Sequence, residues 1–250
     1  MTLAPLVLLA LAGAGMLAGF VDAIAGGGGL IGLPALLAAG VPPIAALGTN
    51  KVQGVIGTAA ASLTYWRRGF VSLRALAIAI PCTYAASFLG AFVVKQIDTS
   101  VLSVAVPAAL IAIALYFLLA PKLTDEDRHA RLKWEVFVPV LGACIGFYDG
   151  LLGPGTGSFL TMGFVALFGL GVTRAAGNTK ILNLASNLGA LTLFIPSGDV
   201  VWPAAAAMAV GQVIGGYLGA LTGIRFGAKL IRPLVVIISL ILAGRLLIFR

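Results

Sequence analysis

Charged side chains are scarce in this sequence, and their scarcity indicates which solvent surrounds the protein. Only 10% of the 250 residues are Asp, Glu, Lys or Arg, whereas 60% are hydrophobic and the mean hydropathy is +1.11. A soluble domain carries about 25% charged residues, so the composition excludes a water-soluble globular protein. Four apolar stretches are long enough, or nearly so, to cross about 30 Å of hydrocarbon as helices. They are residues 3–20, 73–94, 101–120 and 226–249.

Histidine and cysteine are almost missing as well. The chain has one histidine, His129, and two cysteines, Cys82 and Cys144, which lie in apolar stretches without a CxxC pair. Metal sites need clustered Cys and His ligands, and nucleophilic serine enzymes need a base. We therefore expect no cofactor, no metal site and no enzymatic activity, and we interpret the thiols as structural.

Acidic residues are fewer than basic ones, which gives a net charge of +8. No basic stripe with interleaved aromatic residues is present, so we do not expect a nucleic-acid partner. The basic residues gather instead in short links between apolar stretches, as the positive-inside rule predicts for a protein of the bacterial inner (plasma) membrane. The N-terminal apolar stretch lacks a basic region and a cleavage site, so we expect it to remain as the first helix.

An internal repeat divides the chain into halves. The pattern GFxDxxxGxG occurs at 19–28 and again at 146–155. Further along, GTNK at 48–51 corresponds to GNTK at 177–180, and the glycine of an LGA block follows the first glycine of each by 42 residues. The order of the blocks predicts a first membrane repeat over 1–121, a cytoplasmic link over 122–135 and a second membrane repeat over 136–250.

The basic residues also predict that the two halves have opposite orientations. In the first half, three arginines lie within 67–74, and the next loop contains Lys95 alone. In the second half the bias is reversed, because 196–203 has no Lys or Arg and three basic residues lie within 225–232. Equivalent loops then face opposite sides of the membrane. The expected fold is an all-α, multi-pass membrane protein of two inverted-topology repeats, with roughly eight crossing helices and both termini outside.

Glycine interrupts the apolar pattern in each half. Gly26–Gly29 is a run of four glycines, and its counterpart, GPGTGS, occupies 153–158. Neither continues a helix well, because Gly is flexible and Pro lacks a donor. The segment 30–40 would reach only about 16 Å as a helix, roughly half the hydrocarbon thickness, so we expect a re-entrant element.

Such breaks predict a binding site. Unwound backbone at membrane depth is tolerated only where it is buried in protein or lines a cavity. A half-helix that starts at Gly29 or Thr156 would direct its N–H groups and its positive dipole end inward, with Thr156 and Ser158 able to cap it. This arrangement suits an anion.

Four ionisable residues lie in otherwise apolar surroundings: Asp22 and Lys51 in the first half, and Asp149 and Lys180 in the second. A charge at the centre of a membrane helix costs about 2.5 to 3.5 kcal/mol, so these groups should face a cavity or one another. One interpretation is that Asp/Lys ion pairs only hold segments together. The other is that the lysines bind an anion while the aspartates couple or gate its movement, with proton transfer as a further hypothesis.

Amide and hydroxyl side chains surround both lysines. Asn50 and Gln53 are three residues apart, as are Lys180 and Asn183, so each pair shares a helical face. Hydrogen bonding between helices also uses such side chains, and this interpretation stays open. The predicted substrate-binding residues are Gly26, Gly27, Gly28, Gly29, Asn50, Lys51, Gln53, Gly155, Thr156, Ser158, Asn178, Thr179, Lys180 and Asn183, and the predicted coupling or gating residues are Asp22 and Asp149.

Two long blocks and their copies resemble a known family. GFVDAIAGGGGLIGLPALLAAG with the following ALGTNK, and the weaker copies GFYDGLLGPGTGSF and AAGNTK, are similar to the TauE/SafE family of sulfite and organosulfonate exporters. The resemblance covers nearly the whole chain and implies an inner-membrane permease for sulfite, sulfoacetate or related anions. The second copy has Pro154 and Thr156 in place of glycines, which leaves open whether both halves bind substrate equally.

These features together predict a secondary transporter that exports small anions such as sulfite or organosulfonates, as a single chain or a homo-oligomer, in contact with the lipid bilayer. A passive anion channel and a non-transporting membrane scaffold are the alternatives. An intramembrane aspartyl protease is less favoured, because both aspartates occur in GFxD and not in GxGD.

Overall fold

The computed structural model describes residues 3–102, 104–105, 108 and 133–227, and every regular element in these ranges is an α-helix. The all-α prediction is therefore confirmed for the described part of the chain. Most of the predicted spans at 101–120 and 226–249, and most of the link at 122–135, lie outside these residues. The helices are α1 (Pro5–Ala25), α2 (Gly29–Ala38), α3 (Pro43–Arg67), α4 (Leu73–Leu76), α5 (Ala79–Val94), α7 (Trp134–Leu151), α8 (Thr156–Phe168), α9 (Val172–Phe194) and α10 (Trp202–Phe226).

Three of these helices, α1, α7 and α10, are long and apolar enough to cross a membrane. Large hydrophobic side chains cover their outer surfaces, with Leu6 and Val210 exposed by 77% and 64%. The central helices α3 and α9 have 25 and 23 residues, but polar side chains interrupt their apolar character. The polar side chains of α3 and α9 are largely buried. An apolar surface around a polar interior is typical of a helical membrane protein.

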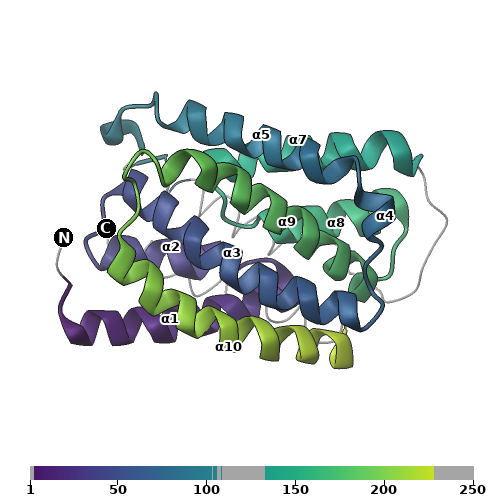
Figure 1. Ribbon diagram of the computed structural model, residues 1–250, viewed down its shortest axis with the longest axis horizontal. Helices are drawn as coiled ribbons and strands as arrows, with labels where there is room; N and C mark the ends of the chain where they lie inside the picture. The colour runs from purple at the N-terminus through teal and green to yellow at the C-terminus, as the bar shows by residue number, and fades with distance from the viewer. Residues whose placement is uncertain (1–2, 103, 106–107, 109–132, 228–250) are drawn as a thin grey trace.

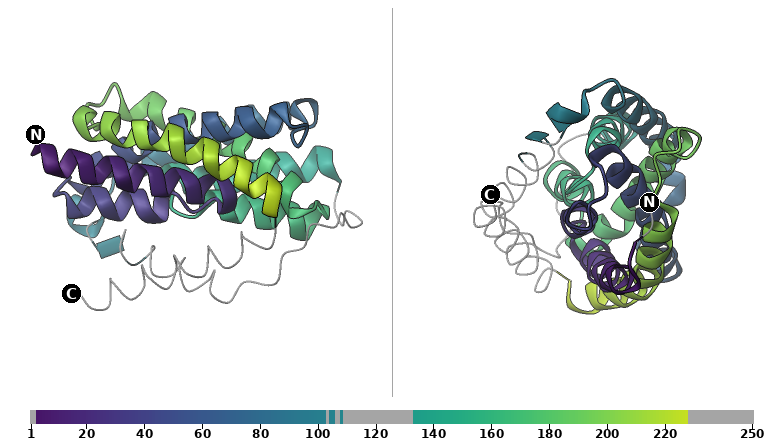
Figure 2. Two further views of the ribbon diagram at one scale, coloured as in Figure 1. Left: turned by 90° about the horizontal axis from the view of Figure 1, so that it is seen from below. Right: turned by 90° about the vertical axis from the view of Figure 1, so that its left-hand side faces the viewer.

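Helices of the two halves pack against each other and not only among themselves. α1 lies along α10, α5 lies along α7, and α3 contacts α9 at the centre. The pairing of α1 with α10 along the long axis is visible in Figure 2. In Figure 1, α1 starts at the left of the molecule whereas α7 starts at the right, so the first helices of the two halves run in opposite directions.

Small residues allow this close packing, as expected for helices in a membrane. A Cβ added to Gly211, Gly215 or Gly219 of α10 would lie 2.0 to 2.4 Å from a backbone carbonyl oxygen of α1. On the other side of the molecule, a Cβ on Gly150 of α7 would lie 1.9 Å from the carbonyl oxygen of Ser87 in α5. The glycines therefore set the distance between helices in both pairs.

The apolar stretch at 73–94 does not form the single helix that its length suggests. It divides into α4 and α5, with a turn at Ala77 and Ile78 between them. Pro81 explains the division, because its ring excludes the carbonyl of residue 77 from the regular helical position and removes one N–H donor. The prediction of one continuous span at this point is wrong.

The two glycine breaks occur where the sequence places them. α1 ends at Ala25 with Gly26 at a φ of 76°, and α2 starts at Gly29. In the second half α8 starts at Thr156, after Gly153 and Gly155 at φ values of 95° and 80°. Both expected half-helix starts are thus confirmed, and α2, with 10 residues, is about 15 Å long.

The two breaks touch each other. A Cβ added to Gly26 would lie 2.1 Å from the carbonyl carbon of Gly157, and a Cβ on Gly157 would lie 2.5 Å from the Cα of Gly26. The hydroxyl of Ser158 donates a hydrogen bond to the carbonyl of Ala25 at the same place. The starts of the half-helices are therefore held together by backbone contact between the halves.

This contact gives a testable difference between two glycines with the same backbone conformation. Gly26→Ala should lower the melting temperature of the detergent-solubilised protein much more than Gly69→Ala does. Gly69 has a φ of 79° and nothing within 4 Å of an added Cβ, so alanine there costs only the left-handed conformation, about 1 to 2 kcal/mol. At Gly26 the clash with Gly157 adds a further cost of about 1 to 3 kcal/mol. Equal melting temperatures for the two variants would contradict the close contact.

Candidate functional site

Two ion pairs cross between the halves at the centre of the molecule. Nζ of Lys51 lies 2.7 Å from Oδ1 of Asp149, and Nζ of Lys180 lies 3.0 Å from Oδ2 of Asp22. The lysine of each half is thus paired with the aspartate of the other. The side chains of Lys51, Lys180 and Asp149 are at most 3% exposed, and that of Asp22 is 13% exposed. Each charge is neutralised by its partner, which is what burial away from water requires.

The two pairs differ in how firmly their carboxylates are held. Asp149 accepts hydrogen bonds from the hydroxyl of Thr156 at 2.7 Å and from that of Ser186 at 2.5 Å. Asp22 accepts one from the backbone N–H of Gly28 at 3.3 Å, which is a long hydrogen bond. Lys180 also donates to the backbone carbonyl of Asp22. The Asp149 carboxylate is therefore fixed on both oxygens, and the Asp22 carboxylate is held more loosely.

Both carboxylates lie beside the start of a half-helix. Thr156 is the first residue of α8, and Gly28 immediately precedes α2. The positive dipole end of a helix stabilises a negative charge within its first turn. The expectation that these helix starts suit an anion therefore agrees with the geometry, with the protein's own aspartates as the anions present.

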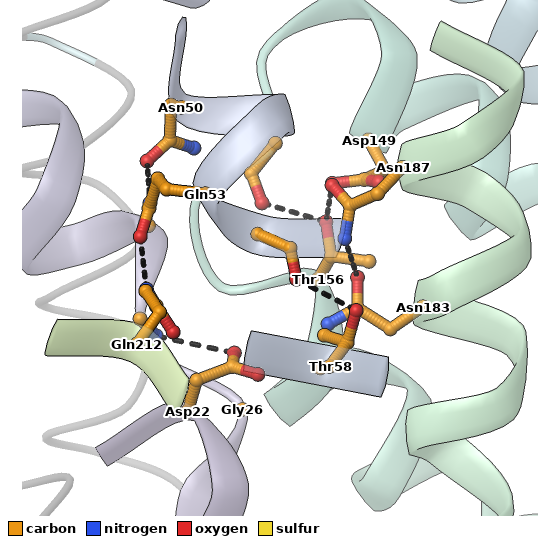
Figure 3. Close-up of a pocket in the computed structure, with 15 residues that line it drawn as sticks. Asp22, Gly26, Asn50, Gln53, Thr58, Asp149, Thr156, Asn183, Asn187 and Gln212 are labelled. Atoms are coloured by element: carbon orange, nitrogen blue, oxygen red, sulfur yellow. Dashed lines mark hydrogen bonds between the residues drawn. The ribbon is translucent and has the colours of Figure 1, made fainter. Parts of the chain in front are cut away.

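A small polar cavity of about 30 Å³ lies between the breaks, large enough for one or two water molecules. Figure 3 shows side chains from both halves around it, with Asn50 and Gln53 on one flank and Asn183 and Asn187 on the other. The lining residues are Asp22, Gly26, Gly28, Gly29, Asn50, Gln53, Gly54, Thr58, Asp149, Gly153, Thr156, Gly157, Asn183, Asn187 and Gln212.

The charges at the cavity surface differ from the sequence expectation. Asp22 and Asp149 line the cavity, whereas Lys51 and Lys180 do not, because the lysines are turned toward the carboxylates. In this conformation the four ionisable side chains sum to zero, and the wall is not electropositive. An anion that binds either lysine would therefore meet an ammonium group that is already paired with a carboxylate.

Nine of the sixteen predicted site residues line the cavity: Asp22, Gly26, Gly28, Gly29, Asn50, Gln53, Asp149, Thr156 and Asn183. Seven do not, namely Gly27, Lys51, Gly155, Ser158, Asn178, Thr179 and Lys180. The two lysines still touch the site through their carboxylate partners.

Three of the seven have structural contacts elsewhere. The amide of Asn178 accepts a hydrogen bond from the N–H of Ser72 at 3.2 Å and donates to the carbonyl of Arg174 at 2.8 Å, which fastens a loop to α9. The hydroxyl of Thr179 accepts from Thr161 at 3.1 Å and joins α8 to α9. Ser158 joins α8 to the end of α1.

The helix-capping role expected for Thr156 and Ser158 is wrong. The residue before α8 is Gly155, and no side chain caps the helix. The hydroxyl of Thr156 lies 2.7 Å from a carboxylate oxygen of Asp149 and from the carbonyl of Gly153, so it donates where a cap would accept. Hydrogen bonds to an ionised acceptor are stronger than those between neutral groups, so the Thr156 hydroxyl donates to the Asp149 carboxylate.

Three cavity side chains are absent from the predicted site residues: Asn187, which lies one helical turn after Asn183 in α9, and two others, Gln212 and Thr58. Gln212 reaches it from α10, and Thr58 reaches it from α3. Both carried a signal: Gln212 is a lone amide in a helix of small and apolar residues, and Thr58 follows Gly54 by one helical turn. Neither lies in a glycine break or within one helical turn of a lysine, so the motifs around those features do not include them.

Apolar helices around a buried cluster of paired charges and amides define an integral membrane protein with an internal polar site, the design of a membrane transporter. The family model described as "Sulfite exporter TauE/SafE" matches residues 11–246. The chain therefore belongs to the TauE/SafE family, as its glycine and lysine blocks predict.

Curated relatives agree with that membership. The "Probable membrane transporter protein ORF9" of a Sinorhizobium species is 47% identical over 234 residues, covering 94% of this chain and 90% of the relative. The "Probable membrane transporter protein YfcA" of Escherichia coli K12 is 44% identical over 243 residues, covering 97% and 90%. A "Probable membrane transporter protein" of Haemophilus influenzae is 42% identical over 232 residues, covering 93% and 91%. No solved structure matches the chain.

Proposed function

We propose that this protein is a secondary transporter that exports small oxyanions, sulfite or organosulfonates, across the bacterial inner membrane, with the central cavity as its substrate site. The family name supports this substrate class. The observation that carries the proposal is the pair of crossed Lys/Asp contacts beside the cavity. Buried ammonium groups that can exchange one anion for another provide a site for a mobile anion in a membrane.

Substrate binding in this scheme is an exchange of anions. An incoming oxyanion takes the place of the Asp22 or Asp149 carboxylate at Lys180 or Lys51. The displaced carboxylate turns toward the cavity or takes up a proton. Because each pair joins the two halves, its opening releases a contact between them, and the cavity can widen beyond the space of one or two waters.

The halves then move as repeats of opposite orientation. We take 1–121 and 136–250 as the two membrane repeats, with the link between them in the cytoplasm and both termini outside. The opposite directions of α1 and α7 support this arrangement. So does the exchange of packing partners, in which α1 pairs with α10 and α7 with α5. Rocking of one repeat against the other around a fixed central site is the common motion of such transporters.

Proteoliposomes that contain the purified protein and unlabelled sulfite test the function. Radiolabelled sulfite added outside should enter by counterflow, saturate with concentration and be inhibited by taurine or sulfoacetate if these share the site. Flux without counterflow would favour a passive anion channel, and no flux of any of these anions would favour a scaffold. Either result would contradict the proposal.

A further inference from the structure

Gln212 enters the cavity through a slot made by two glycines. A Cβ added to Gly57 of α3 would lie 1.9 Å from Oε1 of Gln212, and a Cβ on Gly19 of α1 would lie 2.6 Å from it. The side chain is 2% exposed and crosses from α10 between these helices. The two glycines therefore leave room for an amide group to reach the cavity from an outer helix.

This amide begins a chain of three. The side-chain N–H of Gln212 donates to Oε1 of Gln53, and Nε2 of Gln53 donates to Oδ1 of Asn50 at 2.6 Å. Figure 3 shows the three amides in a row along one wall. Both hydrogen bonds are donated in the direction from Gln212 toward Asn50. The row ends at the NH2 group of Asn50, the far end from Gln212.

The NH2 group of Asn50 can donate hydrogen bonds to a bound group. The residue is 7% exposed, and within the part of the chain that the structure describes its one side-chain hydrogen bond is the one that Oδ1 accepts from Gln53. Nδ2 lies 3.7 Å from the position of a Cβ on Gly29, the first residue of α2. The amide thus meets the positive end of the half-helix, where the N–H of Gly28 is engaged only by its long bond to Asp22.

The second half has an amide pair on the opposite flank, in which Asn187 donates to Asn183 at 3.3 Å, but no amides at the positions that match this row. With a shift of 129 residues, the repeat places Thr179, Leu182 and Thr83 at the positions of Asn50, Gln53 and Gln212. Thr179 is bonded to a threonine of α8, Leu182 is in an apolar cluster, and Thr83 donates to the carbonyl of Ala79 at 2.7 Å. No amide row reaches the start of α8 from these positions.

We propose that Gln212 is a positioning residue for the substrate, which orients the row so that Asn50 donates to an oxygen of one oxyanion at the start of α2. This inference rests on the proposed function and adds to it. It places a single sulfite or sulfonate group on the first-half side of the cavity. Charge-assisted hydrogen bonds from the amide and from the helix start hold the group there.

The direction of the row can be reversed by one substitution, Gln212→Glu. A carboxylate accepts but does not donate, so Gln53 would turn to donate to it and present its oxygen to Asn50. The NH2 group of Asn50 would then donate to Gln53, and its oxygen would face the anion. We expect the dissociation constants of sodium sulfite and sodium methanesulfonate to rise about tenfold or more, and the KM for transport to rise with little change in the maximal rate.

Thr83→Val is the matched control, because it removes a polar group at the equivalent position of the other half and should leave binding unchanged. Asn50→Asp should weaken binding as strongly as Gln212→Glu, and it serves as the second test if the glutamate variant does not fold. Wild-type affinity in either folded variant would overturn the inference, and so would an equal loss in Thr83→Val. If the wild-type protein binds neither probe, the proposed function itself fails, and this inference fails with it.

Discussion

Lys51→Met should abolish anion transport and lower the melting temperature more than any other substitution of a single lysine. Methionine keeps most of the length of the side chain but removes the charge, which leaves the Asp149 carboxyl group buried beside the cavity without its partner. Loss of one partner from a buried pair costs about 3 to 5 kcal/mol. The proposed site also loses the ammonium group that would receive the anion. Counterflow in proteoliposomes and thermal melting in detergent measure the two effects.

Two further variants separate the fold from transport. Lys51→Met with Asp149→Asn removes both charges, so the melting temperature should recover while transport remains absent. Lys95→Met breaks another ion pair between the halves, with Asp199 at 2.6 Å, but these side chains are 25% and 23% exposed. Its cost should be about 1 kcal/mol or less, with transport retained. Transport by folded Lys51→Met, or by the double variant, would remove Lys51 from the proposed site.

The backbone of the site was predictable from the sequence because its determinants are local. A run of glycines, or a proline flanked by glycines, continues a helix poorly, so the starts of α2 and α8 at Gly29 and Thr156 follow from the local sequence. The division of 73–94 has a local cause as well, because the missing N–H donor of Pro81 outweighs the apolar length of the stretch.

The partners within the site were not predictable in the same way. Isolated charges in apolar helices indicated that four groups face a cavity or one another, but which aspartate meets which lysine depends on how the halves pack. The structure pairs Lys51 with Asp149, 98 positions away in the chain, and not with Asp22 of its own half. Gln212 is a further case, because its reach into the cavity depends on α10 lying against α1 and α3.

Asp149→Asn should have the opposite effect on binding from Lys51→Met. Asparagine carries no charge, and its single carbonyl oxygen can still accept a hydrogen bond from one of the two hydroxyls, Thr156 or Ser186. Lys51 has Asp149 as its one partner in the described part of the chain, so its ammonium group is left without a counter-ion. Sulfite should then bind about tenfold or more tightly, while turnover falls, because no carboxylate displaces the anion again. The shift of the melting temperature with sulfite concentration measures the affinity.

The mirror variant, Asp22→Asn, provides the comparison. Lys180 keeps the backbone carbonyl of residue 22 as a hydrogen-bond acceptor when the carboxylate is lost. Its ammonium group therefore retains one partner, whereas that of Lys51 retains none in the described part of the chain. The gain in sulfite affinity should therefore be smaller in Asp22→Asn than in Asp149→Asn, and turnover should fall less. Weaker sulfite binding in Asp149→Asn than in the wild type would mean that the carboxylate assists the anion and does not compete with it, which contradicts the exchange of anions at Lys51.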